Sequence, residues 1–114
     1  MIADDFRQLA LGIEGARTAV RLGAVEFLIG QTVFATVGAP DPAFAVLRLL
    51  PGHQAKAILA VPTVFSPQAG GAGRRGVTCV RLTTATPDIV RPYLVLAAAK
   101  ARNRRSTFTQ IRQD

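Results

Sequence analysis

The segment Gly-Gly-Ala-Gly-Arg-Arg-Gly at residues 70–76 carries the most suggestive chemistry in the sequence. Gly71, Gly73 and Gly76 have the G-x-G-x-x-G spacing of a dinucleotide-binding loop, in which the bare backbone approaches a phosphate. That motif needs a helix directly after the glycines, because the helix N-terminus holds the pyrophosphate. An alternating, β-branched run follows Gly76 instead, and the lysine of a P-loop is absent. We therefore interpret the glycines as positions of a turn or of a close backbone approach.

One histidine and one cysteine are the other side chains that could act as ligands or nucleophiles. His53 follows Pro51 and Gly52 at a predicted helix start, so we expect it to be exposed. Cys79 falls in mid-strand, where an inert thiol is expected, since a nucleophilic cysteine needs a lowered pKa. No group of residues has metal-ligand spacing, and the acidic residues form no evident pair for acid–base catalysis. The sequence therefore predicts a non-enzymatic protein without cofactor or metal.

The positive charge of the chain is concentrated in its second half. The 114 residues include 14 Lys and Arg against 7 Asp and Glu, a net charge of +7. Residues 1–69 hold equal numbers of each sign, so the whole excess falls in residues 70–114. Such asymmetry indicates a polyanionic partner such as nucleic acid. A solubilising surface rich in arginine is the alternative.

Hydrophobic periodicity predicts helices at both ends of the chain and strands between them. The first helix covers residues 4–11, with Asp4 as its N-cap and Gly12 as its stop. A short helix begins at Pro51, and the last helix begins at Thr86-Pro87 and extends to about residue 102. Period-two alternation between turn residues predicts five strands, and residues 65–76 are predicted to be a loop. The strands are residues 18–22, 25–29, 32–37, 44–50 and 77–84.

The predicted order is α-β-β-β-β-α-β-α, which indicates a single α+β domain. Consecutive strands without helical crossovers predict an antiparallel sheet of about five strands, with helices packed on one face. A chain of this length can bury one real core. We expect residues 1–102 to form the domain and residues 103–114 a basic C-terminal tail. The absence of a long apolar run and of a basic leader predicts a cytoplasmic protein with no membrane contact.

Strand alternation also predicts where the arginines point. If Leu47 and Val80 face the core, Arg48 and Arg81 face outward on the uncovered side of the sheet. Arg17 and Arg21 share one face of the weakest strand. These arginines could form a continuous basic surface with the arginines at residues 74 and 75.

Five segments, in order, resemble the MmcQ/YjbR-like family over residues 4–102: DDFRQLALGIEGA, VEFLIGQTVFATVG, LRLLPGHQAKAI, VFSPQAGGAGRRGVTCVRL and IVRPYLVLAAAKA. The fourth segment is the most specific of them. Ala72 stands where a tryptophan is common in the family. The resemblance implies a small α+β domain of the type described as a double-wing DNA-binding motif.

Two hypotheses about function follow. The first is a nucleic-acid-binding module that contacts DNA phosphates through basic side chains. Its expected contact residues are Arg48, Arg74, Arg75, Arg81, Lys100, Arg102, Arg104 and Arg105. The second is an interaction module, a homodimer or a binder of a partner protein, because Val95 and Ala98 fall on the predicted solvent side of the last helix. Exposed apolar patches commonly mark interfaces.

Overall fold

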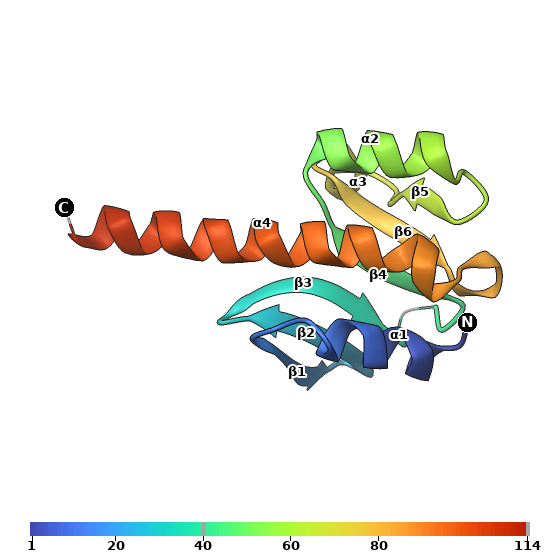
Figure 1. Ribbon diagram of the computed structural model, residues 1–114, viewed down its shortest axis with the longest axis horizontal. Coiled ribbons are helices and arrows are strands. Elements are labelled where there is room, and N and C mark those ends of the chain that lie inside the picture. Colours follow the sequence, from blue (N-terminus) through green and yellow to red (C-terminus); the bar gives the residue numbers. More distant parts are fainter. Residues whose placement is uncertain (40, 114) are drawn as a thin grey trace.

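Six strands form one antiparallel sheet in the order β1-β2-β3-β4-β6-β5 (Figure 1). The computed structural model describes the backbone of residues 1–39 and 41–113 and the side chains of residues 1–39 and 41–103. The strands are β1 (Ala16–Arg21), β2 (Ala24–Ile29), β3 (Thr32–Val37), β4 (Phe44–Arg48), β5 (Phe65–Pro67) and β6 (Val77–Arg81).

The first three strands form two tight hairpins. Leu22 and Gly23 connect β1 to β2 with φ angles of +52° and +81°, as a two-residue turn between right-twisted strands requires. In β3, Phe34 is an extra residue, because Phe27 pairs with Ala35 while Leu28 pairs with Val33. Such a bulge turns two successive side chains toward one side, and Phe34 and Ala35 are both buried.

Three helices cover one face of this sheet, as predicted (Figure 1). They are α1 (Ala3–Leu11), α2 (Pro51–Ala60) and α4 (Pro87–Gln113). The predicted start of the last helix is confirmed, because α4 begins at Pro87 and the Thr86 hydroxyl accepts a hydrogen bond from the Ile89 N–H at 3.4 Å. Two shorter elements, α3 (Gly71–Arg74) and the 3₁₀ turn η1 (Leu82–Thr84), flank β6.

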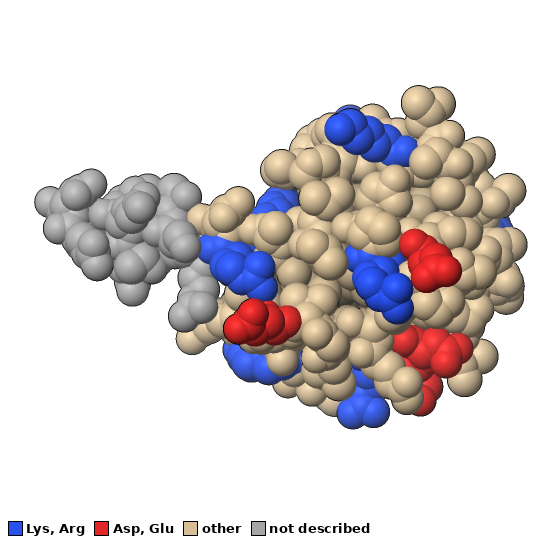
Figure 2. All heavy atoms as spheres, in the orientation of Figure 1, with Lys and Arg blue, Asp and Glu red and all other residues tan. Residues whose placement is uncertain are grey.

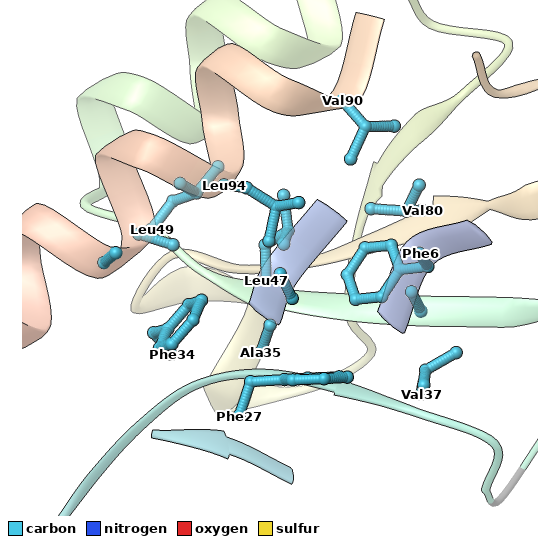
Figure 3. Packing of buried hydrophobic residues seen from close by; sticks show 14 of the residues in the cluster. Phe6, Phe27, Phe34, Ala35, Val37, Leu47, Leu49, Val80, Val90 and Leu94 are labelled. Carbon is cyan, nitrogen blue, oxygen red and sulfur yellow. The ribbon is translucent and has the colours of Figure 1, made fainter. Parts of the chain in front are cut away.

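The core lies between the helices and the sheet (Figure 3). The rings of Phe6 from α1 and Phe27 from β2 meet edge to face, with centroids 5.9 Å apart, a favoured aromatic geometry. Leu47, Val80 and Leu94 are fully or almost fully buried in the same cluster. The burial of Leu47 and Val80 confirms the predicted strand faces, and it leaves Arg48 and Arg81 exposed on the other side.

The structure corrects the sequence-based prediction at both ends of the chain. Helix α1 begins at Ala3, so Asp4 is not its N-cap; instead the Asp5 carboxylate accepts the Ile2 N–H at 2.8 Å. Helix α4 does not end near residue 102 but continues to Gln113. Ala98 of this helix is 1% exposed and belongs to the core, whereas Val95 is 51% exposed as expected.

A third correction concerns residues 65–76, which were predicted to be a loop. They contain the sixth strand, β5, and the four-residue helix α3. A strand of three residues is too short for alternation to reveal it. These two elements decide where the arginines of the glycine-rich segment lie.

Candidate nucleic-acid interface

The glycine-rich segment forms α3 and the turn into β6, and two of its glycines allow close backbone contacts. A Cβ atom on Gly73 would overlap the backbone carbonyl of Gln68, which follows β5. A Cβ atom on Gly76 would overlap the carbonyl of Leu49, which follows β4, and Gly76 has a φ of +107°. Strand β6 follows Gly76, as predicted, so the strand-to-helix geometry of a dinucleotide-binding loop does not form here. The glycines thus serve the packing of this segment.

Gln54 of α2 holds the same segment from the helical side. Its side-chain amide is buried and donates hydrogen bonds to the carbonyl oxygens of Gly73 and Val77, each at 3.0 Å. On the strand side, the Leu49 N–H donates to the Gly76 carbonyl at 3.2 Å. The backbone that carries Arg74 and Arg75 is therefore anchored from two directions.

The two arginines of this segment converge above Gly71. An Arg75 guanidinium nitrogen lies 3.0 Å, and an Arg74 nitrogen 3.8 Å, from the point where a Cβ on Gly71 would stand. Two positive groups thus lie close to one point. Among the described residues, neither forms a salt bridge. Like charges held together in this way attract anions.

A groove opens beside this arginine pair, where β3 and β4 separate. The two strands pair only through Ala35–Val37 and Ala45–Leu47. The groove runs along their seam, has a volume of about 570 Å³, and reaches Ala97 and Ala101 of α4. Its charged lining residues are Arg48 from β4, Arg75 from the turn after α3, and Lys100 from α4. We call it the cationic groove, because no described Asp or Glu lines it.

The three cations of the cationic groove come from elements far apart in the sequence. Arg48 is placed by the alternation of β4, and Arg75 by the anchored turn. The ammonium group of Lys100 donates a 3.5 Å hydrogen bond to the Leu49 carbonyl, which holds the helix side chain at the end of β4. The structure thus brings together three of the eight residues expected to contact nucleic acid, with Arg74 beside them.

Arg81 lies on the same open face of the sheet but at the other end of the strand pair. In the β4–β6 register, Arg81 pairs with Phe44, whereas Arg48 pairs with Val77. The Arg81 guanidinium stacks over the Phe44 ring, 5.3 Å from its centroid, a distance typical of a cation–π contact. Arg81 therefore extends the basic surface along the sheet without lining the groove.

Arg102 lies elsewhere, in a second groove between α1 and α4 that we call the helical groove. This groove has a volume of about 860 Å³. The Arg102 guanidinium donates a 3.0 Å hydrogen bond to the Glu14 carbonyl, and both residues line the groove with Arg91. Figure 2 shows the helical face of the molecule, on which positive and negative side chains alternate. The side chains of Arg104 and Arg105, also expected at the interface, lie outside the described residues.

The remaining candidate ligands and nucleophiles, His53 and Cys79, lie apart from the cationic groove, whose lining includes neither of them. The described residues contain no cluster of three or more histidine, cysteine or acidic side chains that could hold a metal. His53 is half-buried rather than exposed, and its Nδ1 is buried without a hydrogen-bond partner in the described structure. Cys79 is half-buried in β6, where burial raises the pKa of its thiol. In the described part of the chain, no helix is both long and apolar enough to cross a membrane.

Sequence reasoning missed two residues of this region. Gln54 appears in the sequence as an ordinary polar residue of a short helix, yet its amide fixes the position of the arginine-bearing turn. Gln68 lines the cationic groove, and its backbone carbonyl lies so close to Gly73 that a Cβ atom there would overlap it. Nothing in local periodicity marks either residue, because their partners lie in other elements.

The arrangement of helices on one face of an antiparallel sheet is shared with a solved structure. The crystal structure of the Deinococcus radiodurans protein DR2400, described as containing a DUF419 domain, is similar with a TM-score of 0.64. The two chains are 16% identical, and the match covers 82% of this chain and 72% of that one. No family model and no curated protein matches the sequence. At this identity the likeness establishes the fold alone.

Proposed function

We propose that the protein binds nucleic acid without catalysis, through the cationic groove and the adjoining open face of the sheet. The observation that carries the proposal is the convergence of Arg48, Arg75 and Lys100 on one groove with no carboxylate in its described lining. A nucleic-acid backbone is the partner that such a surface suits, since its phosphates are regularly spaced anions.

The chemistry of the side chains supports phosphate as the group contacted. Arginine presents a planar fork of donors that can bind a phosphate through two hydrogen bonds. Arg74 and Arg75 place two such forks side by side over Gly71. Among the described residues, Phe44 is the one aromatic residue on the open face of the sheet, and the Arg81 guanidinium stacks over its ring. Contacts of the arginines with the phosphate backbone of a nucleic acid are therefore favoured over the stacking of bases on aromatic side chains.

The resemblance to the MmcQ/YjbR-like family fits the same proposal. The family fold is described as a double-wing DNA-binding motif, so we propose that this chain is a member and that duplex DNA is its partner. The likeness to the DUF419-containing structure supports the fold on which this proposal stands.

The proposal is tested by titrating a fluorescent 20-base-pair duplex with the protein at several salt concentrations. If Arg48, Arg74, Arg75 and Lys100 each neutralise one phosphate, log K falls against log[salt] with a slope of about −3.6. The double variant Arg48→Gln/Arg75→Gln should lower the magnitude of the slope to about 1.8. Arg91→Gln, on the helical groove, is the matched control and should leave the slope unchanged. A double variant that binds duplex as the wild type does would remove the cationic groove from the proposal.

Self-association through the edge of the sheet is a second candidate function. Strand β1 is an edge strand, and two large apolar side chains near its end are exposed, Val20 by 77% and Leu22 by 91%. An exposed apolar edge can pair with another strand. Light scattering from 5 to 500 μM would show a dimer that Val20→Lys dissociates, whereas a monomer throughout this range would exclude this candidate.

A further inference from the structure

We infer that the cationic groove is a binding site for a phosphomonoester of nucleotide size, either a free nucleotide or the phosphorylated end of a nucleic-acid strand. The inference rests on the proposed function in one respect: the same cations are taken to act on phosphate. It adds that the groove selects a doubly charged terminal phosphate over the singly charged phosphodiester of a continuous backbone.

The balance of charge in the groove favours a dianion. A phosphomonoester carries a charge of about −1.5 to −2 at pH 7 and presents three acceptor oxygens, whereas a phosphodiester carries −1. Arg48 and Arg75 approach the groove from two different elements, and no described carboxylate pairs with either of them. Two arginines around one space are balanced better by two negative charges than by one.

The size and remaining lining of the groove suit a single nucleotide. A volume of about 570 Å³ falls in the range of small-molecule sites. Next to the cations the groove is lined by apolar groups, Val46 and Val77 on the sheet and Ala97 on α4. These can contact a sugar or a base while the phosphate faces the charges.

The groove is also held in shape before any ligand binds. Its Arg75 side is fixed by the Gln54 amide and by the close contacts of Gly73 and Gly76. The Lys100 ammonium is directed by the Leu49 carbonyl. A site whose supporting residues are already ordered loses less entropy on binding.

The test compares three ligands that share one base and sugar, by isothermal titration calorimetry of the full chain at pH 7.5. Adenosine 5′-monophosphate is the monoester, 3′,5′-cyclic adenosine monophosphate the diester, and adenosine the uncharged control. We expect the monoester to bind at least about tenfold more tightly than the diester, as one additional charge-assisted contact implies. Its affinity should fall several-fold at pH 5.5, because the second phosphate pKa is about 6. The diester should not change between these pH values. The charged side chains that face the groove are Arg48, Arg75 and Lys100.

Two variants place the site. Arg75→Gln should weaken the monoester about tenfold, while Arg91→Gln should leave it unchanged; thermal melting checks that both fold. Equal affinities for monoester and diester, or equal binding by wild type and Arg75→Gln, would overturn the inference.

A last arm separates the two sources of the phosphate and keeps the inference distinct from the proposed function. The protein is titrated with 12-nucleotide single strands carrying either a 5′-phosphate or a 5′-hydroxyl. Preference for the phosphorylated strand over the mononucleotide identifies a strand end as the source, and the reverse identifies a free nucleotide; both support the inference. The opposite result would be a protein that binds the duplex, binds no mononucleotide, and does not distinguish the 5′-phosphorylated strand from the 5′-hydroxyl strand. This result would overturn the inference while leaving the proposed function intact. Mononucleotide binding without duplex binding would do the opposite.

Discussion

Both grooves of this small domain border α4, but they differ in size, in the balance of charge and in the backbone beside them. The helical groove is the larger, with a volume of about 860 Å³ against about 570 Å³ for the cationic groove. Its two arginines, however, already interact with other groups of the protein. Arg91 pairs with Asp88 at 3.5 Å, and Arg102 donates to the Glu14 carbonyl. In the cationic groove, by contrast, no described carboxylate pairs with Arg48 or Arg75. Positive charge left unbalanced indicates a site for an external anion better than volume does.

The backbones of the two grooves differ as well. Glycines occur beside both, but in the helical groove they have space around them. A Cβ on Gly12 would lie 3.4 Å from its nearest neighbour, an ordinary contact, whereas one on Gly73 would overlap the Gln68 carbonyl. The cationic groove is thus built on contacts that only glycine permits. Four predictions test this contrast, beginning with the one that should have the largest effect.

The first prediction concerns the glycines. Gly73→Ala should destabilise the fold by more than about 3 kcal/mol, because backbone must move to relieve the overlap with Gln68. Gly12→Ala should change stability by no more than about 1 kcal/mol. Urea unfolding followed by circular dichroism measures both. If the two variants unfold at the same urea concentration, the contrast between the grooves is wrong.

The sequence predicted the strand faces correctly because alternation is a local property. The apolar residues at positions 45 and 47 fix one face of β4, and Arg48 must then point to the other. The cationic groove is different, since Arg48, Arg75 and Lys100 meet only after the chain has folded. Their meeting depends on the separation of β3 from β4, which begins at the Phe34 bulge, and on contacts that no periodic pattern records.

Arg102 illustrates the same limit from the opposite side. It lies two residues from Lys100 on α4, and the concentration of positive charge in this segment predicts both residues at the nucleic-acid interface. Two residues along a helix correspond to about 200° of rotation, which places them on opposite faces. The actual start of α4 and its packing on the sheet decide which of the two reaches the cationic groove.

The second prediction tests the support of the cationic groove with a pair of glutamines. Gln54→Ala removes the two side-chain hydrogen bonds to the Gly73 and Val77 carbonyls. It should cost about 2 kcal/mol, about 1 kcal/mol for each hydrogen bond lost, because each carbonyl keeps only its backbone donor, Gly76 or Gln68. Gln8 lines the helical groove, where its exposed amide donates to Asp4 at 3.2 Å. Gln8→Ala should change stability by less than about 0.5 kcal/mol. Thermal or urea unfolding distinguishes the two, and equal losses would show that Gln54 does not anchor the arginine-bearing turn.

The third prediction concerns the sign of a smaller effect. Arg75→Gln should stabilise the fold by about 0.5 kcal/mol at low salt, because it relieves repulsion from Arg74 and from the other cations. Arg91→Gln should instead lose up to about 0.5 kcal/mol, because it removes an exposed ion pair. Both differences should shrink in 0.5 M salt, where screening is strong. Destabilisation by Arg75→Gln would indicate that its charge is balanced within the protein after all.

The last and smallest effect is the titration of Cys79, which tests how far the field of the cationic groove extends. Cys79 pairs in register with Val46, a residue of the groove lining, so two influences on the thiol compete. Nearby cations would lower the thiol pKa, whereas burial raises it, and burial prevails. As the only cysteine in the chain, it can be followed by its rate of alkylation with iodoacetamide between pH 7 and 11. The midpoint should lie above that of the same chain unfolded in urea. Partial burial slows the reaction at every pH, but it does not by itself move this midpoint.

The raised pKa of Cys79 also affects stability. Since the folded state holds the proton more tightly, this thiol contributes stability below its usual titration range, and that contribution is lost as the pH rises through the folded pKa. Cys79→Ala should remove this slight decline at alkaline pH. A midpoint below that of the unfolded chain would show that the positive field of the groove extends across the open face of the sheet.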